Sequence, residues 1–592
     1  MKISQFHNYI LKTLLVITCF VFLFVNSYAC SVIGVGKNAT KDGSVIVCHS
    51  DDNELSDQRL IYVPAKNHPV GSKRAVNYDQ CSLGFLPEYG AIQDVRYVGS
   101  DRGPAYENSK LPQSIPLGYI PQVRKTYAYL DAGYGVMNEK QVSIGECTCR
   151  ANVEPKPEAG KRIFYSAELS RVALERCDNA RDAIKLMGKL IKEYGYYATG
   201  ETLIVGDKKE AWVMEMCGYD MNGTDGLWVA KRIPDDEVFA AGNEFRIRIV
   251  DPKDKDMMYS DNLFEVCEKK GWWNPKDGPL DWLKAVSPGE YNHPYYSLRR
   301  VWRVLSRVAP SLKLSPWVKD GYTKDYPFSV KPDKKLSVRD VISLYRDHYE
   351  GTEFDQTKGP GAGPWGSPTR YYSSQDQASD RSAFNTLKAA WERPLSVFYC
   401  GFFHVCQSRS FLPDAIGGVC WFGPDRPNEN FVLPFYTGIT DVNDRYEQVY
   451  TGKFDSSKAF WVCDFASNYA DLKYKYMIKD IKAKQLEIEN AVFEKRETVE
   501  KKAANMFLKS PAAARNYLTR YCYKNAETYV PLWWELGKTL IMKYADGYIN
   551  QPPDKMGQEV DYPKWWKKSA YFQNGPKTYK KQKPLPGNWN KK

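Results

Sequence analysis

The stretch CSVIGVGKNATKDGSVIVCHSDDN, residues 30–53, carries the clearest structural signal in the chain. Two of its segments, CSVIGVG and SVIVCHS, are rich in β-branched residues and partly alternate between apolar and polar positions. The segment between them ends in Asp42 and Gly43, a pair that favours the tight turn of a β-hairpin. The sequence therefore predicts an antiparallel hairpin, with Cys30 at the start of its first strand.

A hydrophobic leader precedes this hairpin. The run LLVITCFVFLFV, residues 14–25, follows two lysines and is itself followed by small and polar residues. It is shorter than the roughly 20 apolar residues that a membrane-spanning helix needs. We therefore predict that residues 1–29 are a signal peptide cleaved directly before Cys30. The mature protein is expected in the periplasm or outside the cell, without stable insertion in a membrane.

Cleavage at this position would make Cys30 the first residue, and three roles are then open to it. A lipid anchor usually follows a leucine-like residue three positions earlier, where this chain has Ser27. A structural cysteine needs no special chemistry. The third role is a nucleophile whose own α-amine is the base. An α-amine titrates near pH ~8 and a thiol near pH ~8.5, so neutral amine and activated thiol can coexist.

Composition and charge narrow the class of protein. With 592 residues, of which 43% are hydrophobic, the chain can bury a large core, more readily as two packed units than as one. The net charge of +12 is partly concentrated in residues 552–592, where ten lysines and several aromatic residues accompany three acids. Such a tail can contact nucleic acid, but in an exported protein a solvated terminus is the simpler interpretation. We predict no nucleic-acid partner.

No motif in the sequence indicates a cofactor. A phosphate-binding loop, a dinucleotide fingerprint and a GxSxG nucleophile elbow are all missing from it. The run CGFFHVC, residues 400–406, resembles half of a zinc site but lacks a second pair of ligands. The sequence therefore predicts neither a metal nor an organic cofactor.

The rest of the chain alternates hairpins with amphipathic helices. Residues 135–146 and 201–216 have the pattern of strands joined by turns, and residues 178–195 have that of a capped helix with one apolar face. From about residue 469 onward two long helices are predicted, the second beginning with Ser510 as cap and Pro511 at its first position. We predict an α+β body over residues 30–465 and a helical extension with the basic aromatic tail over residues 466–592. The extension is expected to pack on the body or to support a homo-oligomer.

Six blocks of this sequence, taken in order, resemble the cysteine dipeptidases of the N-terminal-nucleophile (Ntn) hydrolase superfamily, which are similar to choloylglycine and penicillin V hydrolases. The blocks are CSVIGVGKNATKDGSVIVCHSDDN, YGVMNEKQVSIGE, AELSRVALERCDNARDAIKLMGKLIKEYG, IPDDEVFAAGNEFRI, YSLRRVWRVLS and PFYTGITDV with AFWVCDFASN. The resemblance implies a four-layer αββα sandwich with the nucleophile at the head of a strand between two sheets. It also implies hydrolysis of the amide bond of dipeptides or small peptides, through an acyl-enzyme on Cys30 and without a cofactor.

The resemblance further implies roles for individual residues. Cys30 is the nucleophile, Asp52 the carboxylate that orients it or its α-amine, and a neighbouring arginine, Arg299 or else Arg300, the cation near it. Asn138 and Asn243 correspond to donors for the oxyanion of the tetrahedral intermediate. Without the resemblance, each asparagine would be interpreted as a turn or cap residue and Arg299 as part of a surface ion pair.

One departure from the family pattern lies next to the proposed nucleophile. Where the family usually has Arg-Asn before its acidic pair, this chain has His49 and Ser50. We expect His49 and Asp51 to contact the substrate, and substrate recognition or thiol activation to differ accordingly.

Two other functions remain open from the sequence. One is an N-acyl amidase of the bile-salt or penicillin V hydrolase type, and the other is a lipidated envelope protein without catalysis. A dipeptide carries a charged α-amine, so Asp51, Glu146 or Glu244 near the thiol would favour a dipeptidase. An apolar, aromatic-lined pocket would favour an amidase.

Overall fold

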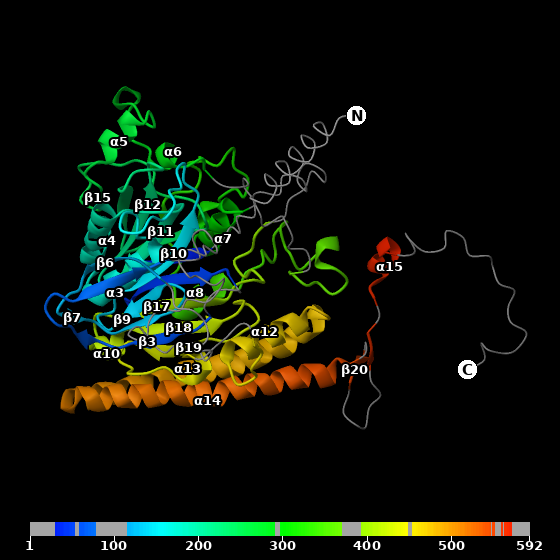
Figure 1. Ribbon diagram of the computed structural model, residues 1–592. Helices are drawn as coiled ribbons and strands as arrows, with labels where there is room; N and C mark the ends of the chain where they lie inside the picture. Colours follow the sequence, from blue (N-terminus) through cyan, green and yellow to red (C-terminus); the bar gives the residue numbers. More distant parts are fainter. Residues whose placement is uncertain are drawn as a thin grey trace, which may run out of the picture.

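Two β-sheets packed against each other form the body of the protein (Figure 1). The computed structural model describes residues 30–53, 58–78, 115–289, 296–369, 392–447 and 453–545, and near the end of the chain 548–550, 558–560 and 562–570. Neighbouring strands of both sheets run antiparallel. The predicted α+β class is confirmed.

The predicted N-terminal hairpin lies at the centre of the seven-stranded sheet. Strand β1 pairs with β2 so that Val32 is opposite His49. Across this sheet the order is β16 (Ser329–Val330), β14 (Val238–Ala241), β1 (Ser31–Val35), β2 (Val45–Asp51), β17 (Phe402–Ser408), β18 (Val419–Pro424) and β19 (Leu433–Tyr436). Because side chains alternate along a strand, His49 and Asp51 share one face of β2.

The second sheet has eight strands and covers that face. Its order is β15 (Met257–Tyr259), β13 (Gly226–Ile233), β12 (Ala211–Gly218), β11 (Gly200–Gly206), β10 (Ser143–Cys149), β9 (Gly135–Asn138), β8 (Tyr129–Asp131) and β3 (Ile61–Val63). The sheets approach closely because Gly145 of β10 has no side chain. A Cβ atom there would lie 2.7 Å from the carbonyl oxygen of Cys48.

Helices α3 (Ser166–Arg176) and α4 (Ala180–Tyr194) pack on the outer face of the eight-stranded sheet. Helix α4 confirms the predicted amphipathic helix. The side chain of Asn179 caps its first turn by accepting from the backbone N–H of Asp182, and Gly195 ends it with φ of +78°. The apolar face predicted for this helix is buried against the sheet.

The outer face of the seven-stranded sheet is covered by a second group of helices. They are α7 (Leu298–Val308), α8 (Val338–Tyr345), α12 (Ala459–Ala470), α13 (Tyr474–Lys509) and α14 (Pro511–Lys543). Helices α13 and α14 are the two long helices predicted from the sequence. Ser510 accepts from the backbone N–H of Ala513 at 3.2 Å, and Pro511 occupies the first position of α14, as predicted.

The predicted division at residue 465/466 does not match the structure, because it falls inside α12. The helices that follow share one hydrophobic core with the seven-stranded sheet. Trp421 of β18 stacks on Phe493 of α13 with 4.0 Å between ring centroids, and Phe431 contacts Trp533 of α14 at 4.8 Å. The long helices are thus a layer over this sheet (Figure 1) rather than a separate extension.

The remaining elements are short. The helices are α5 (Leu263–Lys269), α6 (Trp282–Val286), α10 (Asp414–Gly417), α11 (Asp444–Glu447) and α15 (Lys564–Ala570). Three two-stranded sheets pair β4 (Lys66–Asn67) with β7 (Lys125–Thr126), β5 (Lys73–Asn77) with β6 (Pro116–Pro121), and β20 (Tyr548–Ile549) with β21 (Gln558–Glu559).

Some sequence-based predictions fall on other parts of the chain. The predicted signal peptide, residues 1–29, lies outside the described residues, as does most of the predicted basic tail. Within the described ranges, none of the helices combines the length and the apolar character that crossing a bilayer requires. The 12 cysteines in these ranges are all buried and unpaired.

Candidate active site

Cys30 lies between the two sheets and is 1% exposed. Its carbonyl oxygen accepts hydrogen bonds from Arg300 Nη1 at 2.9 Å and from the Cys147 thiol at 3.4 Å. The next residue, Ser31, is held by the hydroxyl of Tyr345, which donates to its carbonyl oxygen at 3.0 Å. The backbone at the head of β1 is therefore fixed from both faces of the sheet.

Three carboxylates influence the Cys30 thiol. Burial raises the pKa of this thiol well above its usual value, and the charges of Glu146, Asp51 and Asp52 raise it further. Two of the three acids that would favour a dipeptidase, Asp51 and Glu146, therefore act on the thiol. A positive charge placed next to Cys30 would favour its thiolate.

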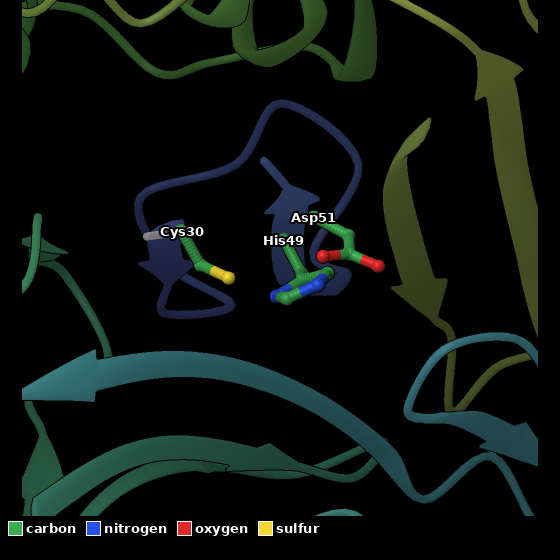
Figure 2. A group of neighbouring side chains, drawn as sticks. All are labelled: Cys30, His49 and Asp51. Atoms are coloured by element: carbon green, nitrogen blue, oxygen red, sulfur yellow. The ribbon is translucent and has the colours of Figure 1, made fainter. Parts of the chain in front are cut away.

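His49 and Asp51 lie beside the thiol (Figure 2). One ligand atom from each of Cys30, His49 and Asp51 lies within 4.8 Å of the others, and all three residues are buried. The Nδ1 atom of His49 is 2.7 Å from the carbonyl oxygen of Glu146 and 3.1 Å from its backbone nitrogen. Burial lowers the pKa of His49 to about 4, so its imidazole is neutral near pH 7.

A glycine makes room for the Asp51 carboxylate at the end of β2. A Cβ atom on Gly133 would lie 2.7 Å from Asp51 Oδ2, closer than van der Waals contact allows. The backbone of Asp51 is held by the N–H of Gly401, which donates to its carbonyl oxygen at 2.8 Å. The loop after β8 can therefore approach the Asp51 carboxylate only because Gly133 has no side chain.

Asp52 forms a buried ion pair with Arg393, whose Nη2 donates to its Oδ2. Burial raises the pKa of Asp52 to about 6, although the charges of Arg393 and Arg300 oppose the rise. Arg393 also donates to the hydroxyl of Tyr296 at 2.8 Å. Arg393 could not be predicted from the sequence, because it belongs to none of the six blocks and lies 341 residues from Asp52. The Glu-Arg-Pro context around it carries no signal of such a role.

The cation next to Cys30 is Arg300 and not Arg299. Besides Cys30, the Arg300 guanidinium donates to Ser31 Oγ at 2.8 Å and to Asn243 Oδ1 at 2.7 Å. Arg299 instead donates to the carbonyl oxygen of Pro316 and lies 3.7 Å above the ring of Phe354. Successive residues of an α-helix point about 100° apart, so the two arginines of α7 face different surroundings.

Asn243 lies beside the site and is joined to it through Arg300. Its backbone adopts φ of +72°, a conformation that asparagine tolerates better than most residues. Its Nδ2 donates to the carbonyl oxygen of Thr148 at 2.7 Å, and its backbone N–H donates to Cys147 Sγ at 2.8 Å. The structure thus brings Asn243 together with Arg300, Cys147 and Cys30.

Asn138 does not have the geometry predicted for an oxyanion donor. Its Nδ2 donates to the carbonyl oxygens of Leu174 at 2.9 Å and Cys177 at 2.8 Å, which occupies both amide hydrogens. Its Oδ1 accepts from the backbone N–H groups of Lys140 and Val142. Asn138 therefore ties the β9–β10 turn to the end of α3, which is the turn role that the bare sequence indicated.

Most of the chain matches a known protein family. The family described as "Peptidase family C69" matches residues 29–487, from just before Cys30 into α13. The protein is therefore a peptidase. The chain belongs to peptidase family C69.

Individual relatives are similar over most of their length. A probable dipeptidase of Salmonella dublin is 28% identical over 421 residues, which cover 69% of this chain and 81% of the relative. A probable dipeptidase B of Lactococcus lactis is 24% identical over 542 residues, covering 88% and 96%. Dipeptidase A of Lactobacillus helveticus is 23% identical over 454 residues, covering 75% and 82%. The resemblance to dipeptidases is confirmed.

Among solved structures, a penicillin V acylase from Agrobacterium tumefaciens matches 69% of this chain and 86% of its own. The sequence identity is 10% and the TM-score is 0.26. These values are too low to bear on the fold or the function.

Proposed function

We propose that this protein is an exported cysteine dipeptidase with the αββα sandwich of the Ntn hydrolases, and that Cys30 is its N-terminal nucleophile. The names of the relatives support the substrate class. The position of Cys30 at the head of a central strand, with Arg300 donating to its carbonyl oxygen, supports the choice of nucleophile. The observation that carries the proposal is the place of Cys30, at the head of β1 between the two sheets and joined through Arg300 to Asn243.

Removal of residues 1–29 would supply the missing base. The peptide nitrogen before Cys30 is not basic, whereas a free α-amine accepts a proton near neutral pH. In the proposed reaction this amine takes the Sγ proton while sulfur attacks the carbonyl carbon of the substrate. The proton then passes to the leaving amine as the C–N bond breaks, which leaves a thioester. Water hydrolyses the thioester and restores the thiol.

The groups around Cys30 have distinct parts in this scheme. Arg300 holds the Cys30 carbonyl and the Asn243 side chain in fixed positions. Asn243 uses one amide hydrogen on Thr148, and we assign its second hydrogen to the oxyanion. Asp51 and Glu146 attract the α-ammonium group of the substrate, as their effect on the thiol indicates. An acylated amine carries no charge, so N-acyl substrates would gain nothing from these acids.

A substrate panel on the protein that begins at Cys30 tests this proposal. Dipeptides, the same dipeptides with an acetylated amine, tripeptides and N-acyl amino acids are compared side by side. We expect hydrolysis of the free dipeptides and a large loss on acetylation. Cys30→Ala should abolish turnover, while Cys30→Ser should retain a small remnant because a hydroxyl needs stronger activation. Faster hydrolysis of N-acyl amino acids than of dipeptides would make the protein an amidase.

A further inference from the structure

We infer that Cys30, His49 and Asp51 form a binding site for a single zinc ion, which reversibly blocks the nucleophile. The three side chains come from the head of β1 and the end of β2 and lie close together between the sheets (Figure 2). Thiolate, imidazole and carboxylate are the three ligand types that Zn²⁺ takes in proteins. Within the described residues they are the only such group whose ligand atoms lie this close together.

The free nitrogen of His49 is the second observation that indicates a ligand. His49 is 1% exposed, and its Nε2 has no hydrogen-bond partner in the described part of the chain. Glu146 already occupies Nδ1, because its carbonyl oxygen lies 2.7 Å and its backbone nitrogen 3.1 Å from this atom. When Nδ1 carries the proton and donates to the carbonyl, Nε2 has a lone pair for a metal. A zinc-binding histidine typically donates its other N–H to a carbonyl or carboxylate in this way.

The separations suit a metal after a small movement. Ligand atoms around a tetrahedral zinc lie about 3.3–3.7 Å apart, because Zn–N and Zn–O bonds measure about 2.0–2.2 Å and Zn–S bonds about 2.3 Å. The three ligand atoms here lie within 4.8 Å of one another, so side-chain rotations that move them by about 1 Å would bring them to these separations.

Charge also favours a cation at this point. A Cys30 thiolate and the Asp51 carboxylate would together balance the two positive charges of zinc, with the Sγ proton released to solvent. The carboxylates of Glu146 and Asp52 act on the same thiol and add negative potential. Arg300 donates to the Cys30 carbonyl oxygen and Arg393 is paired with Asp52, so a further cation here would be held mainly by Cys30, Asp51 and Glu146.

The fourth ligand would come from the mature N-terminus, so this part rests on the proposed function. The α-amine and Sγ of a terminal cysteine can bind one metal as a five-membered chelate. Zinc bound in this way would occupy both the nucleophile and its base. Catalysis would stop without a change of fold, and a chelator would restore it.

Cobalt is the direct probe, because a cobalt–thiolate bond gives an absorption band that reports on the ligand itself. The protein beginning at Cys30 is stripped with a chelator and titrated with Co²⁺, and Zn²⁺ is then added in competition. We expect one Co²⁺ per chain, a thiolate band that zinc removes, and loss of dipeptidase activity in step with zinc occupancy. Alkylation of Cys30 in the wild-type protein should abolish the band without any substitution.

Substitutions then identify the other ligands. Loss of an outer partner of a zinc ligand typically weakens binding about 10–100-fold, so His49→Asn and Asp51→Asn should weaken it by at least about 10-fold. His404→Asn is the matched control, since His404 is also buried and its ring lies 5.4 Å from that of His49. Its affinity for zinc should match that of the wild type.

The outcomes separate this inference from the proposed function. An active dipeptidase that shows no thiolate band, or a band that survives both His49→Asn and Asp51→Asn, would overturn the zinc site and leave the function standing. Zinc binding by the three residues in a protein that hydrolyses no dipeptide would support the site and overturn the function.

Discussion

At the scale of single residues, Arg299 and Arg300 show what the sequence can and cannot decide. Both fit the family block YSLRRVWRVLS, and the block gives no orientation for the helix. Only the packing of α7 on the seven-stranded sheet turns Arg300 toward Cys30 and Arg299 toward Phe354. The pattern therefore predicted a cation near the nucleophile, but not which of two neighbours supplies it.

Substituting each arginine with lysine tests this assignment. A lysine cannot reproduce the fork of hydrogen bonds that Arg300 makes to Cys30, Ser31 and Asn243. We expect Arg300→Lys to lower kcat/KM by about 100-fold, the typical effect of displacing a reacting group by about 1 Å. Arg299→Lys, the matched control, should lower the melting temperature but keep kcat/KM within about threefold. Equal losses of activity in the two variants would contradict the assignment.

Asn138 gives a second prediction at this scale. Its side chain makes four hydrogen bonds to backbone groups, and each contributes about 1 kcal/mol. Asn138→Ala should therefore reduce the free energy of unfolding by about 4 kcal/mol, measured by denaturant titration. The kcat/KM of the protein that remains folded should stay within a few fold of the wild type. A 100-fold loss of activity at normal stability would restore Asn138 as an oxyanion donor.

At the scale of elements, the successful predictions rest on local signals. The hairpin of β1 and β2, the caps of α4 and the start of α14 depend on residues a few positions apart, such as Asn179 and Asp182. The Arg393–Asp52 pair joins residues 341 positions apart, and no local pattern announces it. The convergence of Cys30, His49 and Asp51 likewise requires the register of β1 on β2, which becomes visible only in the folded sheet.

Glu215 of β12 supports the segment that follows Asn243, and its ionisation should make stability depend on pH. Its Oε1 accepts from the backbone N–H groups of Arg246 at 2.6 Å and Ile247 at 3.1 Å. Burial raises the pKa of Glu215 from 4.5 to about 8, although these hydrogen bonds oppose the rise. The folded state thus holds the proton more tightly than the unfolded state.

The sign of the effect follows from this shift. The stabilising contribution of Glu215 is complete below about pH 4.5 and is lost as the pH rises to about 8. Glu215→Gln keeps an uncharged acceptor for both N–H groups, so it should remove this part of the pH dependence. Free energies of unfolding measured between pH 4.5 and 8 should therefore fall more steeply for the wild type than for the variant. Parallel curves would contradict the prediction.

At the scale of the whole molecule, the long helices α13 and α14 look like an appendage in the sequence because many of their residues are charged. A narrow apolar stripe on each is enough to seat it on the seven-stranded sheet, where Trp533 is fully buried. The charged residues of these helices do not reveal that the apolar stripe has a partner far earlier in the chain. One such partner is Trp421, on which Phe493 stacks. The helices complete the core of the catalytic body.

Removal of these helices should therefore unfold the body. A chain ending at Phe465 is expected to be insoluble or to lack a cooperative unfolding transition, because the outer face of the sheet would be exposed. Trp533→Ala is the milder variant, and loss of a buried aromatic side chain costs about 3–5 kcal/mol. Its single unfolding transition should move to a lower denaturant concentration, followed by both circular dichroism and activity. A soluble, active chain ending at Phe465 would show that the extension folds separately.

The proposed mechanism requires Cys30 to be the first residue, and one comparison on matched samples tests this. Dipeptidase activity is measured together with intact mass and N-terminal sequence for protein that begins at Cys30 and for protein that retains residues before it. The mechanism predicts hydrolysis only by the protein whose mass and sequence begin at Cys30, because only that form has a free α-amine beside the thiol. Full hydrolysis by protein confirmed to carry residues before Cys30 would contradict it.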